Sequence, residues 1–325
     1  MSHPNVRTNV NVVKTGDDDT VELSAPATHL SAECFGFSDT GRSRSNNEDQ
    51  FLVAVLDKSL KILQTSLPQS PTRHSSDQSY LLVVADGMGG EAAGEEASAL
   101  ALSSVEDYVL DALKWFACCQ PRDDDEVVVE FRDAISQAHQ RVCYQSQLRP
   151  EQRGMGTTLT LAHSVNDRLF VAHVGDSRAY LYRDGILHQL TRDHTLVEDM
   201  IRQGAIKPEE AATHRWRHVI SSSVGGTSKQ IRIDIHRLHL DADDVVLLCS
   251  DGLTEMVTRE VICEVLVGEG NAEQWCRRLV DQANAAGGKD NITVVIARYF
   301  VADAKQIAAA TGGASAKSIS NVRSL

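Results

Sequence analysis

The order of the expected secondary-structure elements predicts an α+β fold. Short apolar runs come first, two long helical segments follow, and a second group of short runs completes the chain of 325 residues. Strands grouped in this way, rather than alternating with helices, argue against a parallel α/β sheet. Turn residues between neighbouring runs indicate antiparallel hairpins. These hairpin signals are Val165-Asn166-Asp167, Arg183-Asp184-Gly185 and Asp241-Ala242-Asp243.

In the first half of the chain, three strands precede two long helices. The strands are predicted at 33–38, 50–56 and 79–85, and the helices at 92–116 and 125–147. The third strand contains the uninterrupted run Leu81-Leu82-Val83-Val84, which is typical of a buried strand. The first helix begins with small residues, which allow close packing on a sheet.

The second half contains most of the strands and four shorter helices. Strands are predicted at 156–164, 168–175, 178–183, 186–190, 231–239, 244–249 and 292–299. Helices are predicted at 195–203, 208–213, 259–267 and 271–286. Pro208 suits a first helical turn, where its missing N–H needs no partner. The pair Gly287-Gly288 is a typical end for the last helix.

The predicted domain spans residues 31–301. Residues 1–30 are polar and aperiodic and are expected to form a flexible N-terminal extension, and residues 302–325 a C-terminal tail. The Ser-, Pro- and Gln-rich segment 57–78 is predicted to be an inserted hairpin loop whose tip lies far from the acidic ends of its strands. The segment of about 193–230 is rich in His and Arg, and a helical excursion there could form a lid.

Composition limits the classes of partner. The net charge of −13, from 32 basic and 45 acidic residues, argues against a nucleic acid or an anionic membrane as the partner. An odd number of cysteines, seven, without a secretory signal predicts reduced thiols in a cytoplasmic protein. No apolar run approaches the ~18 residues of a membrane helix.

Acidic residues cluster at the ends of the predicted strands. Asp86 and Asp251 end apolar runs, whereas Asp49 and Asp290 begin them. If these runs are antiparallel neighbours, all four carboxylates lie at the same end of a sheet. Carboxylates without His or Cys favour the hard cations Mg²⁺ and Mn²⁺. The motifs are Asn46-Asn47-Glu48-Asp49, Ala85-Asp86-Gly87-Met88-Gly89-Gly90, Gly175-Asp176-Ser177, Ser250-Asp251-Gly252 and Lys289-Asp290-Asn291.

This pattern suits a two-metal hydrolase, in which two ions about 4 Å apart activate a water and clamp a phosphate. We predict that Asp86 bridges the two ions, because the following Gly87 leaves room for a backbone oxygen to approach the second ion. Asp251 and Asp290 would complete the shell of the first ion. Mn²⁺ or Mg²⁺ is the expected cofactor.

Three further residues are predicted to act beside the ions. Arg44 offers the bidentate fork that phosphate favours, and Arg42 is its close competitor. Glu48 and Asp49 are expected to hold metal-bound waters rather than touch metal.

The chain resembles the metal-dependent protein phosphatases of type 2C, in their bacterial style, over roughly residues 33–300. Six segments match in order and spacing: SDTGRSRSNNED (38–49), VVADGMGGEAAGEEAS (83–98), RGMGTTLTLA (153–162), VAHVGDSRAYLYRDG (171–185), LLCSDGLTEMV (247–257) and GGKDNITVVIA (287–297). The resemblance implies a four-layer αββα sandwich of two antiparallel sheets flanked by helix pairs. It also implies hydrolysis of phosphoserine and phosphothreonine in proteins, with a serine/threonine kinase and its targets as partners.

By motif, the resemblance carries the ligand roles to Asp86, the carbonyl of Gly87, Asp251 and Asp290, and the phosphate role to Arg44. Asp176 matches a position linked to a third, weaker ion, and residues 193–230 match the family's flap. The chain has Met88 where some relatives carry a His, which leaves the general acid unassigned.

Other interpretations remain open at this stage. The chain could be a catalytically reduced binding module of the same fold, although no ligand position is lost, or a small-molecule phosphoester hydrolase, which would need a closed pocket. Asp176 could be only a turn residue, and Asp243-Asp244 reads as a plain hairpin. His194, His214 and His218 are interpreted as flap surface, with contact to the substrate as the alternative, and Cys249 as core.

Overall fold

The computed structural model describes residues 30–61, 64, 72–89, 93–111, 124–211, 213–227 and 230–301. The predicted C-terminal tail and all of the N-terminal extension except Leu30 lie outside these residues, as does most of the tip of the 57–78 loop. Within the described part, no helix combines the length and apolar character needed to cross a membrane.

All strand pairs are antiparallel, and they form two sheets. The first sheet has the order β1 (Leu30–Asp39), β12 (Ile292–Val301), β11 (Val245–Cys249), β7 (Arg178–Arg183) and β8 (Ile186–Gln189). The second has the order β10 (Asp234–His239), β6 (Arg168–Val174), β5 (Leu159–Val165), β3 (Thr72–Met88), β4 (Gly156–Thr157) and β9 (Val224–Gly225), and β2 (Asp49–Lys61) also pairs with β3.

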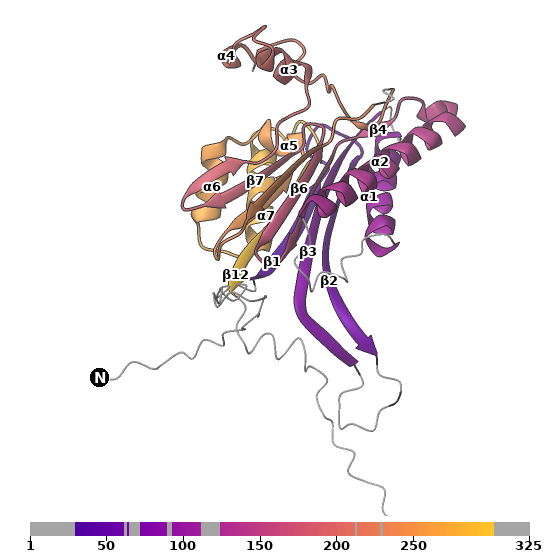
Figure 1. The fold of residues 1–325 in the computed structure, drawn as a ribbon. Coiled ribbons are helices and arrows are strands. Elements are labelled where there is room, and N and C mark those ends of the chain that lie inside the picture. Colours follow the sequence, from indigo (N-terminus) through magenta and orange to yellow (C-terminus); the bar gives the residue numbers. More distant parts are fainter. Residues whose placement is uncertain are drawn as a thin grey trace, which may run out of the picture.

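Helices cover the outer face of each sheet (Figure 1). The second sheet carries α1 (Ala93–Asp111) and α2 (Asp124–Leu148), and the first carries α5 (Asp251–Thr254), α6 (Arg259–Val267) and α7 (Ala272–Ala285). A 3₁₀ helix at Pro150–Gln152 follows α2. The helices α3 (Leu196–Arg202) and α4 (Pro208–Ala211) stand away from the body in Figure 1.

Alternation along the strands produces three apolar cores and therefore four layers. In β3, Leu81 and Val83 pack under α1 and α2, whereas Leu82 and Val84 face the other sheet. In β11 the residues facing the helices are likewise separated by residues facing the opposite sheet, because successive side chains of a strand point to opposite faces. The predicted αββα sandwich of two antiparallel sheets is confirmed. The prediction that Cys249 belongs to the core is also confirmed.

The hairpin of β2 and β3 is longer than predicted. Residues 57–61 and 72–78, expected in the loop, belong to the two strands, whose arms extend beyond the body in Figure 1. A register shift between Asp57 and Ser59 interrupts their pairing. Polar composition at a hairpin end does not prevent strand pairing, since both faces there can meet water. The short elements β9 and α5 were not predicted.

Candidate metal centre

Antiparallel pairing brings the predicted acidic residues to one end of both sheets. In the β2–β3 register, Asp49 lies directly opposite Asp86. Asp251 follows β11 and Asp290 precedes its antiparallel partner β12, so these two also meet. Asp176 lies in the turn between β6 and β7. The four carboxylates therefore share one end of the fold, as predicted, but they come from two sheets and not from the single sheet that was predicted. A cavity of about 460 Å³ opens there, lined by Arg44, Glu48, Asp86, Gly87, Met88, Gly89, Asp176, His218, Ile220, Asp251, Glu255, Asp290 and Asn291.

Asp86 is held by its backbone and keeps its carboxylate free. Its N–H donates to Thr158 Oγ1 at 2.9 Å, and its carbonyl accepts the hydroxyl of Thr157 at 2.8 Å. The carboxylate itself makes no hydrogen bond within the described residues, so it is available to a ligand in the cavity. A strand end fixed in this way suits a residue that must hold a precise position.

Asp49 lies behind the cavity wall and is 4% exposed. Its Oδ2 accepts the hydroxyls of Ser250 and Thr293, each at 2.7 Å. Its Oδ1 is buried without a hydrogen-bond partner in the described structure, which is costly for a carboxylate oxygen. An oxygen orphaned in this way fits a site that is completed by a cation or by a water bound to it.

The glycines near Asp86 are explained by a close helix contact. A Cβ on Gly87 would meet the carbonyl oxygen of Gly94 in α1 at 2.2 Å, and one on Gly94 would meet the Glu48 carboxylate at 2.5 Å. Gly87 therefore allows α1 to approach the strand end, in addition to the free approach of a ligand that the sequence suggested.

Asn291 joins the loop before β2 to the start of β12. Its Nδ2 donates to the carbonyls of Thr40 at 3.0 Å and Asn46 at 2.8 Å, and its Oδ1 accepts the N–H of Glu48 at 2.9 Å. One amide side chain thus sets the position of the loop that carries Arg44 and Glu48.

Arg44 projects into the cavity, whereas Arg42 does not line it. The Arg44 guanidinium donates to Asp290 Oδ2 at 2.7 Å, and its side chain is 54% exposed. The geometry favours Arg44 over Arg42 as the group that meets an incoming anion. The hydrogen bond to Asp290 raises the pKa of Arg44 above its already high ordinary value, so the guanidinium stays charged.

The carboxylates repel one another, which indicates a need for positive charge. Burial raises the pKa of Asp86 well above its ordinary value, and Asp49 and Asp251 raise it further. Burial also raises the pKa of Asp251, with Asp176 as the next cause. The pKa of Asp49 is raised to about 6, chiefly by burial. This hard-oxygen donor set fits Mn²⁺ or Mg²⁺.

We expect the metal-free protein to lose stability as the pH rises from about 4 to about 7. Burial raises the pKa of Asp49 to about 6 and that of Asp176 to about 7, above the ~3.9 of an unfolded aspartate. Between these values the folded state binds more protons than the unfolded state, so stability falls with increasing pH. Mn²⁺ binds the ionised groups, so the stabilisation it adds should grow over the same window.

The measurement is thermal unfolding across this pH window, with chelator and with Mn²⁺. A stabilisation by Mn²⁺ that is constant from about pH 4.5 to 7 would contradict the assignment of these carboxylates to a metal site.

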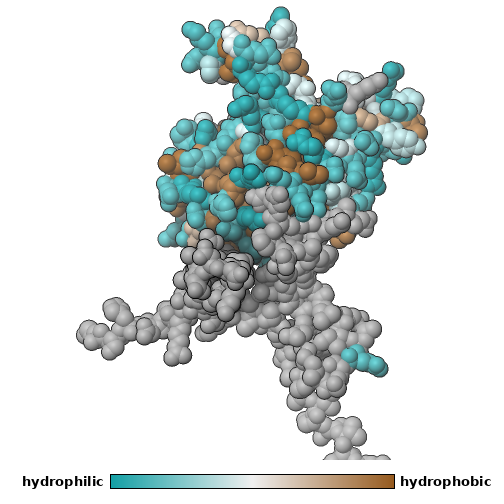
Figure 2. All heavy atoms as spheres, in the orientation of Figure 1, coloured by the Kyte–Doolittle hydropathy of each residue, from teal (hydrophilic) through white to brown (hydrophobic). Residues whose placement is uncertain are grey.

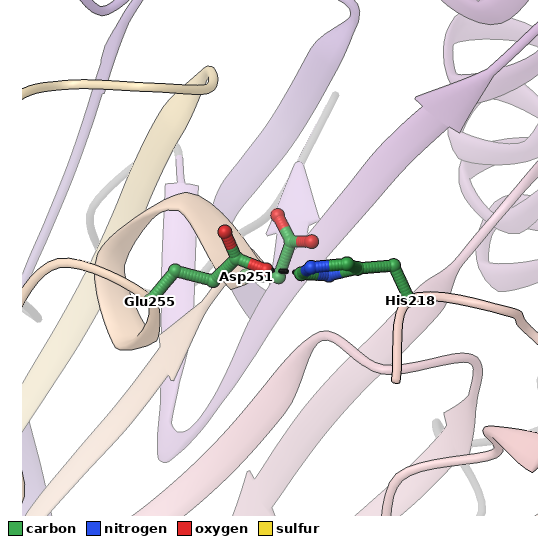
Figure 3. Close-up of side chains that lie close together, drawn as sticks. All are labelled: His218, Asp251 and Glu255. Carbon is green, nitrogen blue, oxygen red and sulfur yellow. Dashed lines mark ion pairs between the residues drawn. The ribbon is translucent and has the colours of Figure 1, made fainter. Parts of the chain in front are cut away.

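Two residues at the cavity were missed by the sequence reasoning. His218 Nδ1 lies 2.7 Å from Glu255 Oε1, and both lie beside Asp251 (Figure 3). His218 returns from the flap and Glu255 follows α5, four residues after Asp251. This spacing puts Glu255 one helical turn from Asp251 and was the available signal. His218 is exposed on the flap, as interpreted, and it also lines the cavity.

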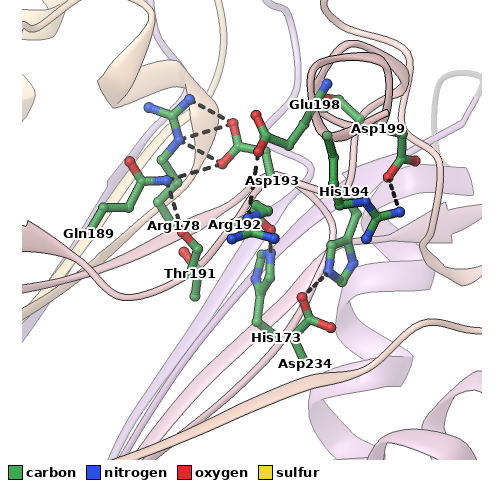
Figure 4. A network of polar contacts seen from close by, with 12 residues as sticks. His173, Arg178, Gln189, Thr191, Arg192, Asp193, His194, Glu198, Asp199 and Asp234 are labelled. Carbon is green, nitrogen blue, oxygen red and sulfur yellow. Dashed lines mark hydrogen bonds and ion pairs between the residues drawn. The ribbon is translucent and has the colours of Figure 1, made fainter. Parts of the chain in front are cut away.

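His194 was also interpreted as flap surface, but it is fully buried at the base of the flap. Its Nδ1 accepts the N–H of Gly175 at 3.3 Å, and its Nε2 lies 3.1 Å from Asp234 Oδ2 (Figure 4). Its backbone N–H donates to Gly175 and its carbonyl accepts from Ser221, on the returning side of the flap. His194 therefore links Gly175, the residue before Asp176, to both sides of the flap base.

The expected lid is not formed by the helices of the 193–230 segment. The helices α3 and α4 stand off the body (Figure 1), and of the flap residues that the structure describes only His218 and Ile220, on the returning side, border the cavity. Beside the base of the segment, Arg178 binds both oxygens of Asp193, with its Nη2 at 2.7 Å from Oδ2. The 193–230 segment is thus anchored at its base and extends away from the body of the domain.

The fold and the site define a class: an αββα sandwich with a cluster of carboxylates at one end. Residues 69–294, more than half of the chain, match the family model for protein phosphatase 2C. The chain is 35% identical over 264 residues to the serine/threonine protein phosphatase PstP of Mycobacterium tuberculosis, covering 80% of this chain and 43% of that protein. It is 31% identical over 259 residues to the serine/threonine phosphatase stp of Listeria monocytogenes, covering 80% and 92%.

A solved structure agrees with these relatives. The catalytic domain of PstP in complex with two manganese ions has a TM-score of 0.64 and 33% identity, covering 83% of this chain and 99% of that chain. The chain therefore belongs to the protein phosphatase 2C family, and its domain is that of a metal-dependent serine/threonine protein phosphatase. It spans less than half the length of the mycobacterial relative.

Proposed function

We propose that this chain hydrolyses phosphoserine and phosphothreonine in proteins and that residues 31–301 form the phosphatase domain. The observation that carries the proposal is the convergence of Asp86, Asp176, Asp251 and Asp290 with one arginine around a single cavity. The family, and the two manganese ions in the PstP structure, support the same chemistry.

The proposed metal ligands are Asp86 as the bridge, the carbonyl of Gly87, Asp251 and Asp290, with Asp176 at a third, weaker position. A bound pair of Mn²⁺ or Mg²⁺ would supply an activated water and neutralise charge on the phosphate. The orphaned oxygen of Asp49 and the raised pKa values of Asp86 and Asp251 support this donor set.

The remaining residues position the phosphate and the site around it. Arg44 presents donors that bind phosphate oxygens, and its contact with Asp290 aims it across the cavity. Glu48, held through its backbone by Asn291 and Ser98, faces the cavity beside Asp86, where it could hold a water. We propose the same role for Asp49, whose Oδ1 has no hydrogen-bond partner in the described structure.

Phosphorylated proteins are the proposed substrates, and a serine/threonine kinase and its targets the proposed partners. The net charge of −13 supports a protein partner rather than a nucleic acid or an anionic membrane. We propose a cytoplasmic location, because the five cysteines that the structure describes are all free thiols.

The structure bears on the two competing functions. A small-molecule hydrolase would need an enclosed pocket, whereas this cavity shares His218 and Glu255 with a second cavity beneath the flap. A catalytically reduced binding module would lack a ligand, but every proposed ligand is present at the site. Both observations favour an active enzyme with an extended substrate.

The test is an Mn²⁺-dependent assay on a phosphothreonine peptide beside nucleotide and sugar phosphates. We expect peptide hydrolysis to exceed hydrolysis of the small phosphoesters and to stop with chelator. Preference for a small phosphoester would reject the protein-phosphatase proposal, and no turnover on any substrate would favour the binding module.

Arg44→Ala is expected to raise KM for a phosphopeptide about 10-fold, since a charge-assisted hydrogen bond is worth ~1.5 kcal/mol or more. Metal affinity should change less, because a guanidinium has no lone pair to offer a cation. Arg42→Ala is the matched control and should leave KM near normal. Steady-state kinetics and calorimetric Mn²⁺ titration provide both readouts. Collapse of metal affinity with an unchanged KM would show that Arg44 has a structural role.

A further inference from the structure

A second cavity, of about 550 Å³, lies between the flap and the body of the domain. We call it the flap groove. One wall comes from α3 and α4, the other from the residues after Asp251 and from Lys289, and Arg217 and His218 lie on the returning side of the flap. The groove and the metal cavity share His218 and Glu255. A peptide whose phosphate sits at the metal centre therefore has a direct path into the groove.

The charged residues of the groove leave two cations without partners. Most of the charges are paired: Arg178 with Asp193, His218 with Glu255, and Glu198 with Arg192 outside the groove at 3.6 Å. In the part of the chain that the structure describes, neither Arg217 nor Lys289 has a carboxylate within ion-pair distance, and both are exposed. They approach the groove from opposite sides, one from the flap and one from the loop before β12.

Apolar side chains form the rest of the surface. Val197, Ile201 and Pro208 line the groove from the flap, and Met256 lines it from the body. A groove with an apolar surface and two free cations suits a segment that combines apolar and acidic side chains. The face shown in Figure 2 is largely hydrophilic, with apolar side chains over the sheets and on part of the flap.

We propose that the flap groove binds the residues that flank the phosphorylated side chain and that Arg217 and Lys289 select acidic residues there. This inference rests on the proposed function and names its substrate class: phosphoproteins with Asp or Glu close to the phosphorylated residue.

Because the whole chain is acidic, selection of acidic peptide residues depends on the cations of the flap groove alone. With a net charge of −13, the molecule as a whole repels acidic peptides, so an acidic segment gains only where cations are unpaired. Both cations are solvent-exposed, and salt should therefore weaken their effect, since charges are screened beyond about 8 Å at physiological ionic strength.

The experiment compares two phosphothreonine peptides of equal length, one with Asp and Glu on both sides of the phosphorylated residue and one with Asn and Gln instead. At low salt we expect kcat/KM to favour the acidic peptide about 5-fold, from two exposed pairs. The variants Arg217→Gln and Lys289→Gln should each reduce this ratio, and the double variant should bring it below about 2-fold. Raising the salt should reduce the ratio in the unmodified enzyme.

Lys207→Gln is the matched control, because Lys207 is an exposed flap cation that does not line the groove. It should leave the ratio between the peptides unchanged. An equal fall of the ratio in Lys207→Gln would show a general charge effect and overturn the groove assignment.

Equal rates on both peptides would overturn the inference but leave the phosphatase proposal standing, whereas no hydrolysis of either peptide would reject the phosphatase proposal itself. Competition by anionic vesicles or single-stranded nucleic acid, without competition by an unphosphorylated acidic peptide, would also overturn it.

Discussion

Asp86→Asn is expected to lower Mn²⁺-dependent turnover by at least ~10²-fold, because two-metal hydrolysis depends on both ions. The amide keeps the shape of the side chain but removes the charge that would hold two cations together. Hydrogen bonds to Thr157 and Thr158 fix the backbone of Asp86 at the strand end, so the amide of the variant should stay where the carboxylate was. Turnover on a phosphopeptide and Mn²⁺ titration by calorimetry should show loss of activity together with loss of one tightly bound ion.

The same variant should fold at least as well as the unmodified protein when metal is absent. Burial and the carboxylates of Asp49 and Asp251 raise the pKa of Asp86, so the charged form is unfavourable in the folded state at neutral pH. Removing the charge relieves this cost, and Tm in chelator should hold or rise. Asp281→Asn, on an exposed position of α7, is the control. Near-normal turnover of Asp86→Asn would show that Asp86 does not bridge metals.

Asp244→Asn is expected to reduce the free energy of unfolding by about 2–3 kcal/mol, since it breaks a buried charged network. Asp244 is 1% exposed. Its two oxygens accept from Arg183 Nε at 2.8 Å and Nη2 at 2.5 Å, and Oδ2 also accepts the N–H of Asp241 at 2.7 Å. An asparagine cannot serve all these donors with one oxygen.

Asp243→Asn is the control, since it makes the same change one residue earlier. The Asp243 side chain is 81% exposed, and its contact with Arg298 at 3.4 Å is a surface pair. Its φ of 71° is one that Asn adopts readily. We expect a change within about 0.5 kcal/mol, measured by denaturant unfolding. Similar losses in both variants would show that the turn, rather than the buried pair, supplies the stability.

Asp244 also shows where pattern reasoning was wrong. In the sequence it is the second of two turn aspartates and reads as part of a plain hairpin. The structure separates the two: Asp243 takes the left-handed conformation and faces water, whereas Asp244 turns inward to Arg183, 61 residues away. No local sequence pattern predicts a partner that is so far away in the chain.

Several features could be predicted from the sequence because they depend on residues that are neighbours in the chain. The predicted hairpins at Asn166 and Asp184 have positive φ values of 54° and 52° at those residues. The helix α7 ends at Ala285, before the predicted glycine pair, and Gly288 donates back to the carbonyl of Ala283. Turn and cap chemistry is local, so it can be read from a few consecutive residues.

The sequence by itself determined two acidic pairs, Asp49 with Asp86 and Asp251 with Asp290, because one member of each pair begins an apolar run, the other ends one, and antiparallel strands bring such ends together. The two pairs lie in different sheets, so only the packing of the sheets brings them to one site. The tertiary structure alone decided what surrounds them. It buried Asp49 behind the cavity, and it placed His218 and Glu255 at its edge and Arg217 and Lys289 in the flap groove. The physical reason is that strand ends follow from alternation along the chain. Side-chain partners such as His194 and Asp234, 40 residues apart, depend instead on how separate elements pack.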